Sequence, residues 1–200
     1  MAHDKCAYCE TKLGQKDSYM EVEHYRCKSL HPKLVVEWSN LLPSCKRCNT
    51  NKGTHDVDHE AIINPAEINP KEHLKFYNNR YYAKDDSKLG KSTISVLALN
   101  HYERLSIILF ETGVKICESL SSCRMQMESP RTDETNRELP RQLTALLREA
   151  QPDKEFSAFT ATIILGCPDY EVIKGLFVDA NMWTTEMNNL ERVAIGIALL

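Results

Sequence analysis

Two Cys-x-x-Cys pairs near the N-terminus constrain this chain more than any other feature. Cys6 and Cys9 lie in CAYCE, Cys45 and Cys48 begin CKRCNTNKG, and 35 residues separate the two pairs. Four thiolates in two such knuckles are typical of a tetrahedral zinc site, which is closed to water and stabilises a fold. Residues 1–60 are poor in apolar side chains, and so small a domain usually needs a structural metal. The spacing therefore predicts that these four cysteines bind a structural Zn²⁺.

The other four cysteines lack paired short spacing, so we expect small buried hydrophobic side chains at Cys27, Cys117, Cys123 and Cys167. The chain has no run of about 18 apolar residues. Its N-terminus, MAHDKCAYCE, has no apolar segment of the kind found in secretory signals. We therefore expect a cytoplasmic protein without a membrane span, in which paired cysteines hold metal rather than form disulfides.

Charge is distributed unevenly along the sequence. The net charge of the 200-residue chain is −3. Residues 24–53 nevertheless carry six Lys or Arg against one acidic residue, Glu37, a local balance of +5. Such a basic segment on an acidic chain favours phosphate contact near the N-terminus, although an unevenly charged solvated surface is the simpler alternative.

The pattern of elements predicts an α+β fold. We expect a strand ending near residues 23–24, a second short strand over 40–45 and a helix beginning near 46. Residues 61–90 contain two Asn-Pro turns and read as an irregular connector with a hairpin. Helical periodicity begins near 91. The predicted domains are a zinc-stapled module (1–60), the connector (61–90) and a mainly helical region that docks a partner (91–200).

Within the helical region, the periodicity predicts one long helix with an apolar face and a series of shorter ones. The polar, proline-containing stretch 128–140 reads as a surface loop. The C-terminal VAIGIALL is apolar on all sides and is either a last core helix or a surface for a partner. Trp38 is expected to anchor the core. Further helices are expected over 141–150, 156–165, 170–180 and 186–200, and the apolar face of the long helix comprises Leu105, Ile108, Leu109, Thr112, Ile116 and Leu120.

The segments EVEHYRCKS and WSNLLPSCKRCNTNK resemble the HNH endonuclease motif, which has the ββα-metal fold, in its version with two zinc knuckles. His24, preceded by the acidic Glu23, matches the first histidine of the motif. Asn40 matches the central asparagine, and Asn49, directly after the last knuckle cysteine, matches the third position. Lys52 completes the C-x-x-C-[HN]-x-x-K ending.

The resemblance implies metal-dependent hydrolysis of nucleic-acid phosphodiester bonds. An imidazole changes protonation near neutral pH, so His24 is the candidate base that activates water. A hard cation such as Mg²⁺ or Mn²⁺ needs oxygen ligands, which Glu23 and Asn49 offer. The resemblance assigns to Asn40 the role of pinning the loop behind His24.

Two points on the ligands stay open. Adjacent strand residues face opposite sides, so Glu23 and His24 share a site only where the strand ends or twists. Glu21 and Asp56 are alternative carboxylate ligands. The basic side chains expected to contact phosphates are Arg26, Lys28, Lys46, Arg47 and Lys52.

CAYCE, VEHYR, NLLPSCKRCN, INPAEINPKEHLKF and GKSTISVLALN together resemble the HNH subunit of Septu-type anti-phage systems (PtuB-like), also found with retrons. That resemblance implies a PtuA-like ABC-type ATPase as partner, with a retron reverse transcriptase and its DNA as further candidates. The sequence contains no P-loop of its own. A competing hypothesis is a non-catalytic zinc module that binds nucleic acid or organises an assembly. The choice between DNA and RNA stays open.

Overall fold

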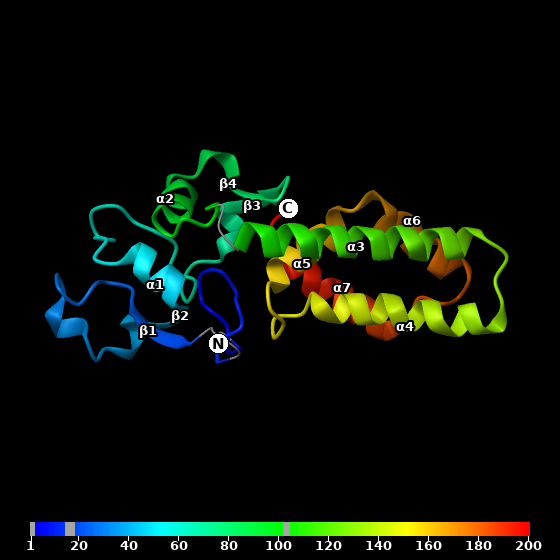
Figure 1. Cartoon of the computed structure of the whole chain (residues 1–200), viewed down its shortest axis with the longest axis horizontal. Helices are drawn as coiled ribbons and strands as arrows, with labels where there is room; N and C mark the ends of the chain where they lie inside the picture. Colours follow the sequence, from blue (N-terminus) through cyan, green and yellow to red (C-terminus); the bar gives the residue numbers. More distant parts are fainter. Residues whose placement is uncertain (1–2, 15–18, 102–104) are drawn as a thin grey trace. The chain divides into compact units, whose positions relative to one another are not determined.

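The computed structural model describes residues 3–14, 19–101 and 105–200, which form two compact units, Met1–Ser106 and Ile107–Leu200 (Figure 1). The first contains small hairpins and short helices, and the second is entirely helical over the residues described. The expected α+β class is thereby confirmed. Among the described residues, no helix has both the length and the apolar character needed to cross a membrane. The predicted boundaries at 60 and 90 stay a prediction.

The N-terminal hairpin follows the predicted order of two strands and a helix. Strands β1 (Met20–His24) and β2 (Leu41–Cys45) pair antiparallel, with Met20 opposite Cys45 and His24 opposite Leu41. Helix α1 (Lys46–Lys52) begins directly after β2 and packs on both strands. This order confirms the two expected strands and the expected helix. Two 3₁₀ turns, Pro32–Leu34 and Trp38–Asn40, lie in the loop between the strands.

A second hairpin lies in the segment expected to be an irregular connector. Strands β3 (Leu74–Tyr77) and β4 (Arg80–Ala83) pair antiparallel, and helix α2 (Lys88–Val96) packs on β4. The helix approaches so closely that a Cβ on Gly90 would lie 2.2 Å from the His73 carbonyl oxygen. Only glycine fits that position without a backbone shift. The expected hairpin is confirmed.

Two hydrogen bonds join helix α2 and its C-terminal end to earlier segments of the first unit. Asn51 Nδ2 on α1 donates to the Leu97 carbonyl at 3.0 Å. The Ile63 amide donates to Thr93 Oγ1 at 2.8 Å. The partners are 46 and 30 residues apart. The first bond holds α1 against the end of α2, and the second holds the segment after α1 against the middle of α2. The apolar core beneath them comprises Val57, Ile62, Ile63, Leu74, Phe76, Leu97 and Leu99.

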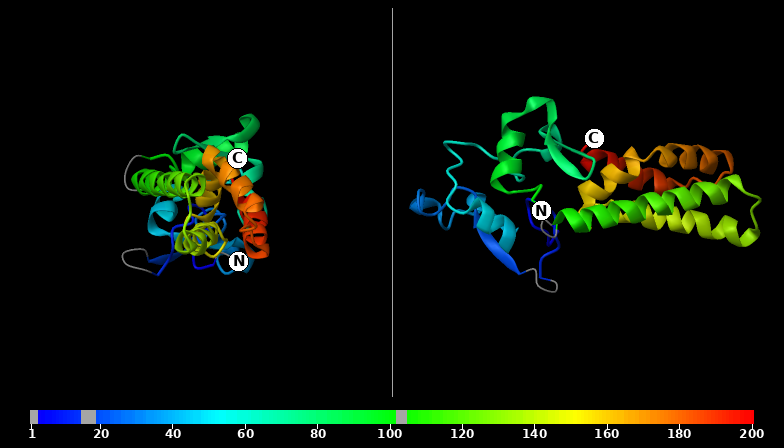
Figure 2. Two further views of the ribbon diagram at one scale, coloured as in Figure 1. Left: turned by 90° about the vertical axis from the view of Figure 1, so that its right-hand side faces the viewer. Right: turned by 45° about the horizontal axis from the view of Figure 1, so that its top comes forward.

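Five helices make up the second unit. The first two, α3 and α4, run antiparallel and meet at one end (Figures 1 and 2). Helix α7 packs on α4 and α5, and α6 packs on α5. One continuous core includes the fully buried rings of Tyr170 and Phe177. The helix bounds are α3 Leu105–Glu128, α4 Asp133–Glu149, α5 Ser157–Gly166, α6 Pro168–Asp179 and α7 Thr185–Ile197.

Helix α4 corrects the prediction of a surface loop over 128–140. Thr132 caps the helix by accepting a hydrogen bond from the Thr135 amide, and acidic residues fill the first turn. Pro140 lies inside the helix. The buried Leu139 and Leu143 are four residues apart and continue the apolar face across it. Packing therefore outweighs the hydrogen bond that proline removes.

Other expectations fail at single residues. Trp38 is 77% exposed rather than a core anchor, because the short 3₁₀ turn that carries it lies at the surface.

The unpaired cysteines and the apolar helix faces agree with the predictions only in part. Cys117 is exposed and Cys167 partly buried, whereas Cys27 and Cys123 are buried as expected. On α3, Leu105, Leu109, Ile116 and Leu120 are buried as predicted, but Ile108 is 37% exposed. At the C-terminus, Ala194, Ala198 and Leu199 are buried, while Ile195 and Leu200 are exposed.

Candidate functional site

The four predicted cysteines converge in one buried cluster. The sulfur atoms of Cys6, Cys9, Cys45 and Cys48 all lie within 4.8 Å of one another. The Cys9 and Cys45 sulfurs are 3.7 Å apart. Tetrahedral Zn–S bonds of about 2.3 Å place two sulfurs about 3.8 Å apart, so the spacing fits zinc. The cluster is therefore consistent with a structural Zn²⁺. With four sulfur ligands, such an ion has no coordination position left for water or substrate.

Without a metal ion, hydrogen bonds within the cluster divide the sulfurs: they lower the pKa of Cys45 and Cys6, whereas the hydrogen bond to Cys45 raises the pKa of Cys9 and of Cys48. The Cys45 sulfur accepts from the Cys48 amide at 3.5 Å and so also caps α1. Hydrogen bonding to the Cys48 side chain lowers the pKa of Cys45 to about 7. Hydrogen bonding to Cys45 likewise lowers the pKa of Cys6. Arg47 adds positive charge, with Nη2 3.8 Å from the Cys48 sulfur. A cation among the sulfurs would stabilise all four thiolates.

His24 is the last residue of β1 and is half-buried. Its Nε2 lies 3.0 Å from the carbonyl oxygen of Val35, in the loop between the strands. A carbonyl only accepts hydrogen bonds, so Nε2 must carry the proton. In the neutral ring, the free lone pair is therefore on Nδ1. The contact fixes both the orientation and the tautomer of an imidazole able to accept a proton.

Asn40 holds the loop that supplies this carbonyl. The buried side chain accepts from the Arg26 amide at 2.7 Å and donates to the Arg26 and Leu34 carbonyls at 3.1 and 3.2 Å. Its own carbonyl accepts from the Tyr25 amide at 2.9 Å. Leu34 directly precedes Val35, so Asn40 and His24 form hydrogen bonds to two consecutive backbone carbonyls. The loop is thus tied to the ends of both strands.

Two carboxylates of β1 contact residues of α1. Asn49 Nδ2 donates to Glu21 Oε2 at 2.8 Å. Lys52 Nζ lies 2.5 Å from Glu23 Oε1 and donates to the His24 carbonyl at 2.9 Å. Glu21 and Glu23 alternate with His24 along the strand, and Asn49 and Lys52 are one turn apart on the helix. Both pairings follow from these two periodicities.

Glu23 is the more enclosed carboxylate. It is 2% exposed, and burial raises its pKa despite the opposing effects of Lys52 and His24. The sequence places Lys52 among phosphate-contacting residues, but its ammonium is buried against Glu23 and the hairpin backbone. Lys52 therefore holds β1 and α1 together. Among the described residues, no hydrogen bond or ion pair joins Asn49 directly to His24.

The remaining predicted basic residues differ in availability. Arg26 bonds both oxygens of Asp58, at 2.9 and 3.3 Å, and Arg47 adjoins the cysteines. Lys28 and Lys46 are exposed and make no ion pair within the described parts of the chain. The two lysines are thus the freest of this set for an anionic ligand.

A second cluster of possible metal ligands contains one residue that the sequence analysis names as a ligand, Asp56, and two that it does not. His31, Asp56 and Asp58 bring one ligand atom each within 4.8 Å of the others. Asp56, an alternative carboxylate ligand, thus lies with His31. Asp58 already bonds Arg26, which offsets its charge. The signal in the sequence is Asp-x-Asp in THDVDHE, while His31 is brought there by the loop.

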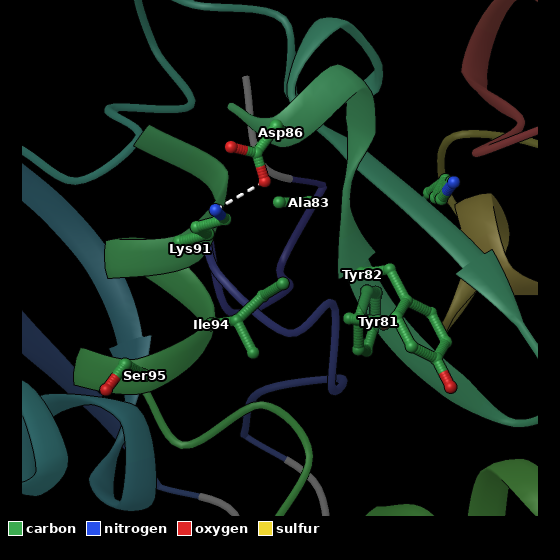
Figure 3. A pocket seen from close by; sticks show the side chains of 8 residues that line it. Tyr81, Tyr82, Ala83, Asp86, Lys91, Ile94 and Ser95 are labelled. Atoms are coloured by element: carbon green, nitrogen blue, oxygen red, sulfur yellow. Dashed lines mark ion pairs between the residues drawn. The ribbon is translucent and has the colours of Figure 1, made fainter. Parts of the chain in front are cut away.

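A shallow pocket of the first unit lies between β4 and α2 (Figure 3). Lys91 and Asp86 form an ion pair at one side, and Ile94 and Tyr82 face the hollow. Its lining includes none of the residues of the HNH-like segment. The hairpin built by β1, β2 and α1 is therefore the stronger candidate site.

Two bacterial proteins are similar to this chain, over 96% and 64% of its length. Septu protein PtuB of Bacillus thuringiensis is 39% identical over 201 residues, covering 96% of this chain and 77% of that protein. The chain belongs to the Septu PtuB family. Septu protein PtuB of Bacillus mycoides strain KBAB4 is 30% identical over 158 residues, covering 64% of this chain and 52% of that relative. No family model and no solved structure matches the sequence.

Membership of the PtuB family confirms the lineage that the sequence segments indicate. The first alignment spans both units, so the helical region belongs to the resemblance as much as the cysteine-bound hairpin does. A PtuB-like function must therefore account for both.

Proposed function

We propose that this PtuB-family chain is a metal-dependent HNH endonuclease, the effector of a Septu-type anti-phage defence system. The observation that carries the proposal is the hydrogen bond from His24 Nε2 to the Val35 carbonyl. It leaves Nδ1 as the basic nitrogen at the end of a strand held by the cysteine cluster. His24 takes a proton from the attacking water. Asn40 keeps the Val35 carbonyl in place and is a positioning residue.

In this proposal Glu23 and Asn49 would hold the catalytic cation, Mg²⁺ or Mn²⁺, at the end of β1, where Glu23 adjoins His24. A carboxylate accepts only, so the Glu21 contact turns the amide nitrogen of Asn49 toward Glu21 and frees the amide oxygen for a cation. Lys52 orients Glu23 in the same way. Glu21 and Lys52 therefore support the two ligands from outside the metal site. The cation would supply charge stabilisation on the phosphate and on the leaving oxygen.

The structural Zn²⁺ on Cys6, Cys9, Cys45 and Cys48 holds the hairpin in shape. Arg26, Lys28, Lys46 and Arg47 attract the phosphate backbone, with the two exposed lysines most available. The helical region of residues 91–200 docks a PtuA-like ABC-type ATPase, which would handle ATP because the sequence has no P-loop of its own. A retron reverse transcriptase and its DNA are further candidate partners.

The test of the proposal is cleavage by the His24→Ala variant. Wild type and variant are assayed with Mg²⁺ on plasmid DNA and on RNA, with and without the ATPase. We expect cleavage to fall by at least about 100-fold, the usual contribution of a general base. His59→Ala, a change at an exposed histidine, is the matched control. Equal cleavage by wild type and His24→Ala, with zinc content unchanged, would show the assignment to be wrong.

A second experiment separates the carboxylates. Mn²⁺ binding is measured by electron paramagnetic resonance for Glu21→Gln and Glu23→Gln. Glu23→Gln should abolish binding, because it removes a ligand. Glu21→Gln should weaken it modestly, because it loosens only the Asn49 amide. The reverse ranking would make Glu21 the ligand, and loss in Asp56→Asn alone would move the cation to the cluster with His31.

The alternative function is a zinc module that binds nucleic acid without cutting it. The exposed Lys28 and Lys46 favour this candidate, since neither needs a catalytic residue nearby. It predicts binding that is insensitive to Mg²⁺, lost in Lys28→Ala with Lys46→Ala, and unaffected by His24→Ala.

A further inference from the structure

Trp38 stands out among the residues around His24. Its side chain is 77% exposed, and the neighbouring Val36 is 88% exposed. No hydrogen bond, ring contact or ion pair is made by the Trp38 indole within the parts of the chain that the structure describes. A large apolar ring left in water in this way usually marks a binding surface.

The ring is held close to His24 by the loop geometry. Trp38 begins the 3₁₀ turn that ends at the buried Asn40. It therefore lies three residues before Leu41, the strand partner of His24. A 3₁₀ turn rises about 2 Å per residue and paired strands lie about 5 Å apart, which puts the Trp38 backbone roughly 10 Å from that of His24. That distance corresponds to a few nucleotides along a strand.

The charge of the loop suits a nucleic acid. Residues 25–40 carry Arg26, Lys28 and Lys33 against the single acid Glu37. Lys28 and Lys33 are exposed and make no ion pair with any described residue. An exposed aromatic ring among unpaired lysines is the combination that binds single strands, with stacking on the ring and phosphates on the lysines.

We propose that Trp38 stacks on an unpaired base of the nucleic acid whose phosphate lies at His24, so that the substrate is single-stranded at the cleavage site. The inference rests on the proposed nuclease function and adds the substrate class. Bases in a duplex stack on each other, and only an unpaired base offers its face to an indole. A protein seated permanently on Trp38 would also cover the approach to His24, because the residues from Val35 to Trp38 are contiguous.

Fluorescence gives a test that does not depend on cleavage. The chain has two tryptophans, so Trp183→Phe leaves Trp38 as the only one. In a His24→Ala background, this variant is titrated with oligo-dT, oligo-U, an abasic oligonucleotide of equal charge and a blunt duplex. We expect saturable quenching by oligo-dT or oligo-U, with the tighter of the two identifying the sugar. The abasic strand and the duplex should quench weakly.

Affinity measurements complete the test. Trp38→Ala should weaken single-strand binding about 5- to 100-fold, the usual range for loss of one base stack, and Trp38→Phe should retain most of it. Equal quenching by the abasic strand or the duplex would overturn the proposal. So would unchanged affinity in Trp38→Ala together with weaker binding to the ATPase, which would make Trp38 a protein contact. Stacking without any cleavage by wild type would refute the nuclease alone, and cleavage without stacking would refute only this inference.

Discussion

Lys52 Nζ lies 2.5 Å from Glu23 Oε1, and neither side chain is more than 2% exposed. The pair joins α1 to β1. Lys52→Met should lower the free energy of unfolding by about 3–5 kcal/mol, because it leaves the Glu23 carboxylate buried without its partner. Urea unfolding of the zinc-bound protein measures the loss. Lys46→Met, at an exposed position on the same helix, should change stability little.

The double variant Glu23→Gln with Lys52→Met sharpens that prediction. Removing both charges should cost less than removing Lys52 alone, since no unpaired ion stays buried. Equal losses in the single and double variants would mean that Lys52 acts through its hydrogen bond to the His24 carbonyl instead.

Asn40 should be important for both stability and cleavage. Asn40→Ala removes three hydrogen bonds of the loop and leaves the Arg26 amide without its acceptor, at a cost of about 1–3 kcal/mol. If the proposed role of His24 holds, kcat should fall while zinc content stays constant. Nitrogen NMR of the His24 ring checks the cause: the Nε2–H form should dominate in the wild type and lose that dominance in the variant. A variant that keeps the wild-type tautomer and rate would exclude a positioning role.

Metal removal should unfold the N-terminal hairpin. Wild type should contain about one Zn²⁺ per chain, and Cys45→Ala should lose it, because four sulfurs are needed to close the site. Elemental analysis and circular dichroism measure both effects. Cys123→Ala, in the helical core, should keep its zinc. Full zinc in Cys45→Ala would show that the cluster is not the site.

The buried thiol of Cys123 gives a pH-dependent prediction. Burial raises its pKa from 9.0 to about 11. Only the thiolate reacts. The alkylation rate of Cys123 should therefore rise with pH around its raised pKa of about 11 rather than around 9.0. Because the folded protein keeps this proton longer than the unfolded chain, the free energy of unfolding should fall as pH rises above about 9. Mass spectrometry of labelled peptides follows the reaction, and urea-denatured protein, in which the shift disappears, is the control.

The sequence predicts the β1–β2–α1 hairpin well because cysteine spacing and strand alternation are local signals. The contact between Asn49 and Glu21 could not be anticipated, since it depends on which helix face meets the strand. Pro140 misleads in the opposite direction: the polar residues before it suggest a loop, and only packing of Leu139 and Leu143 reveals a helix. Trp38 shows that an aromatic side chain in a loop carries no local sign of burial.

The loop between β1 and β2 is fastened near its two ends, through the Asn40 contacts with Arg26 and Leu34. The side chains of Lys28 and Lys33 take no part in these contacts. Substitutions at these two lysines are therefore expected to leave the orientation of the His24 ring unchanged. Contacts with the substrate and the position of the base can then change independently of each other.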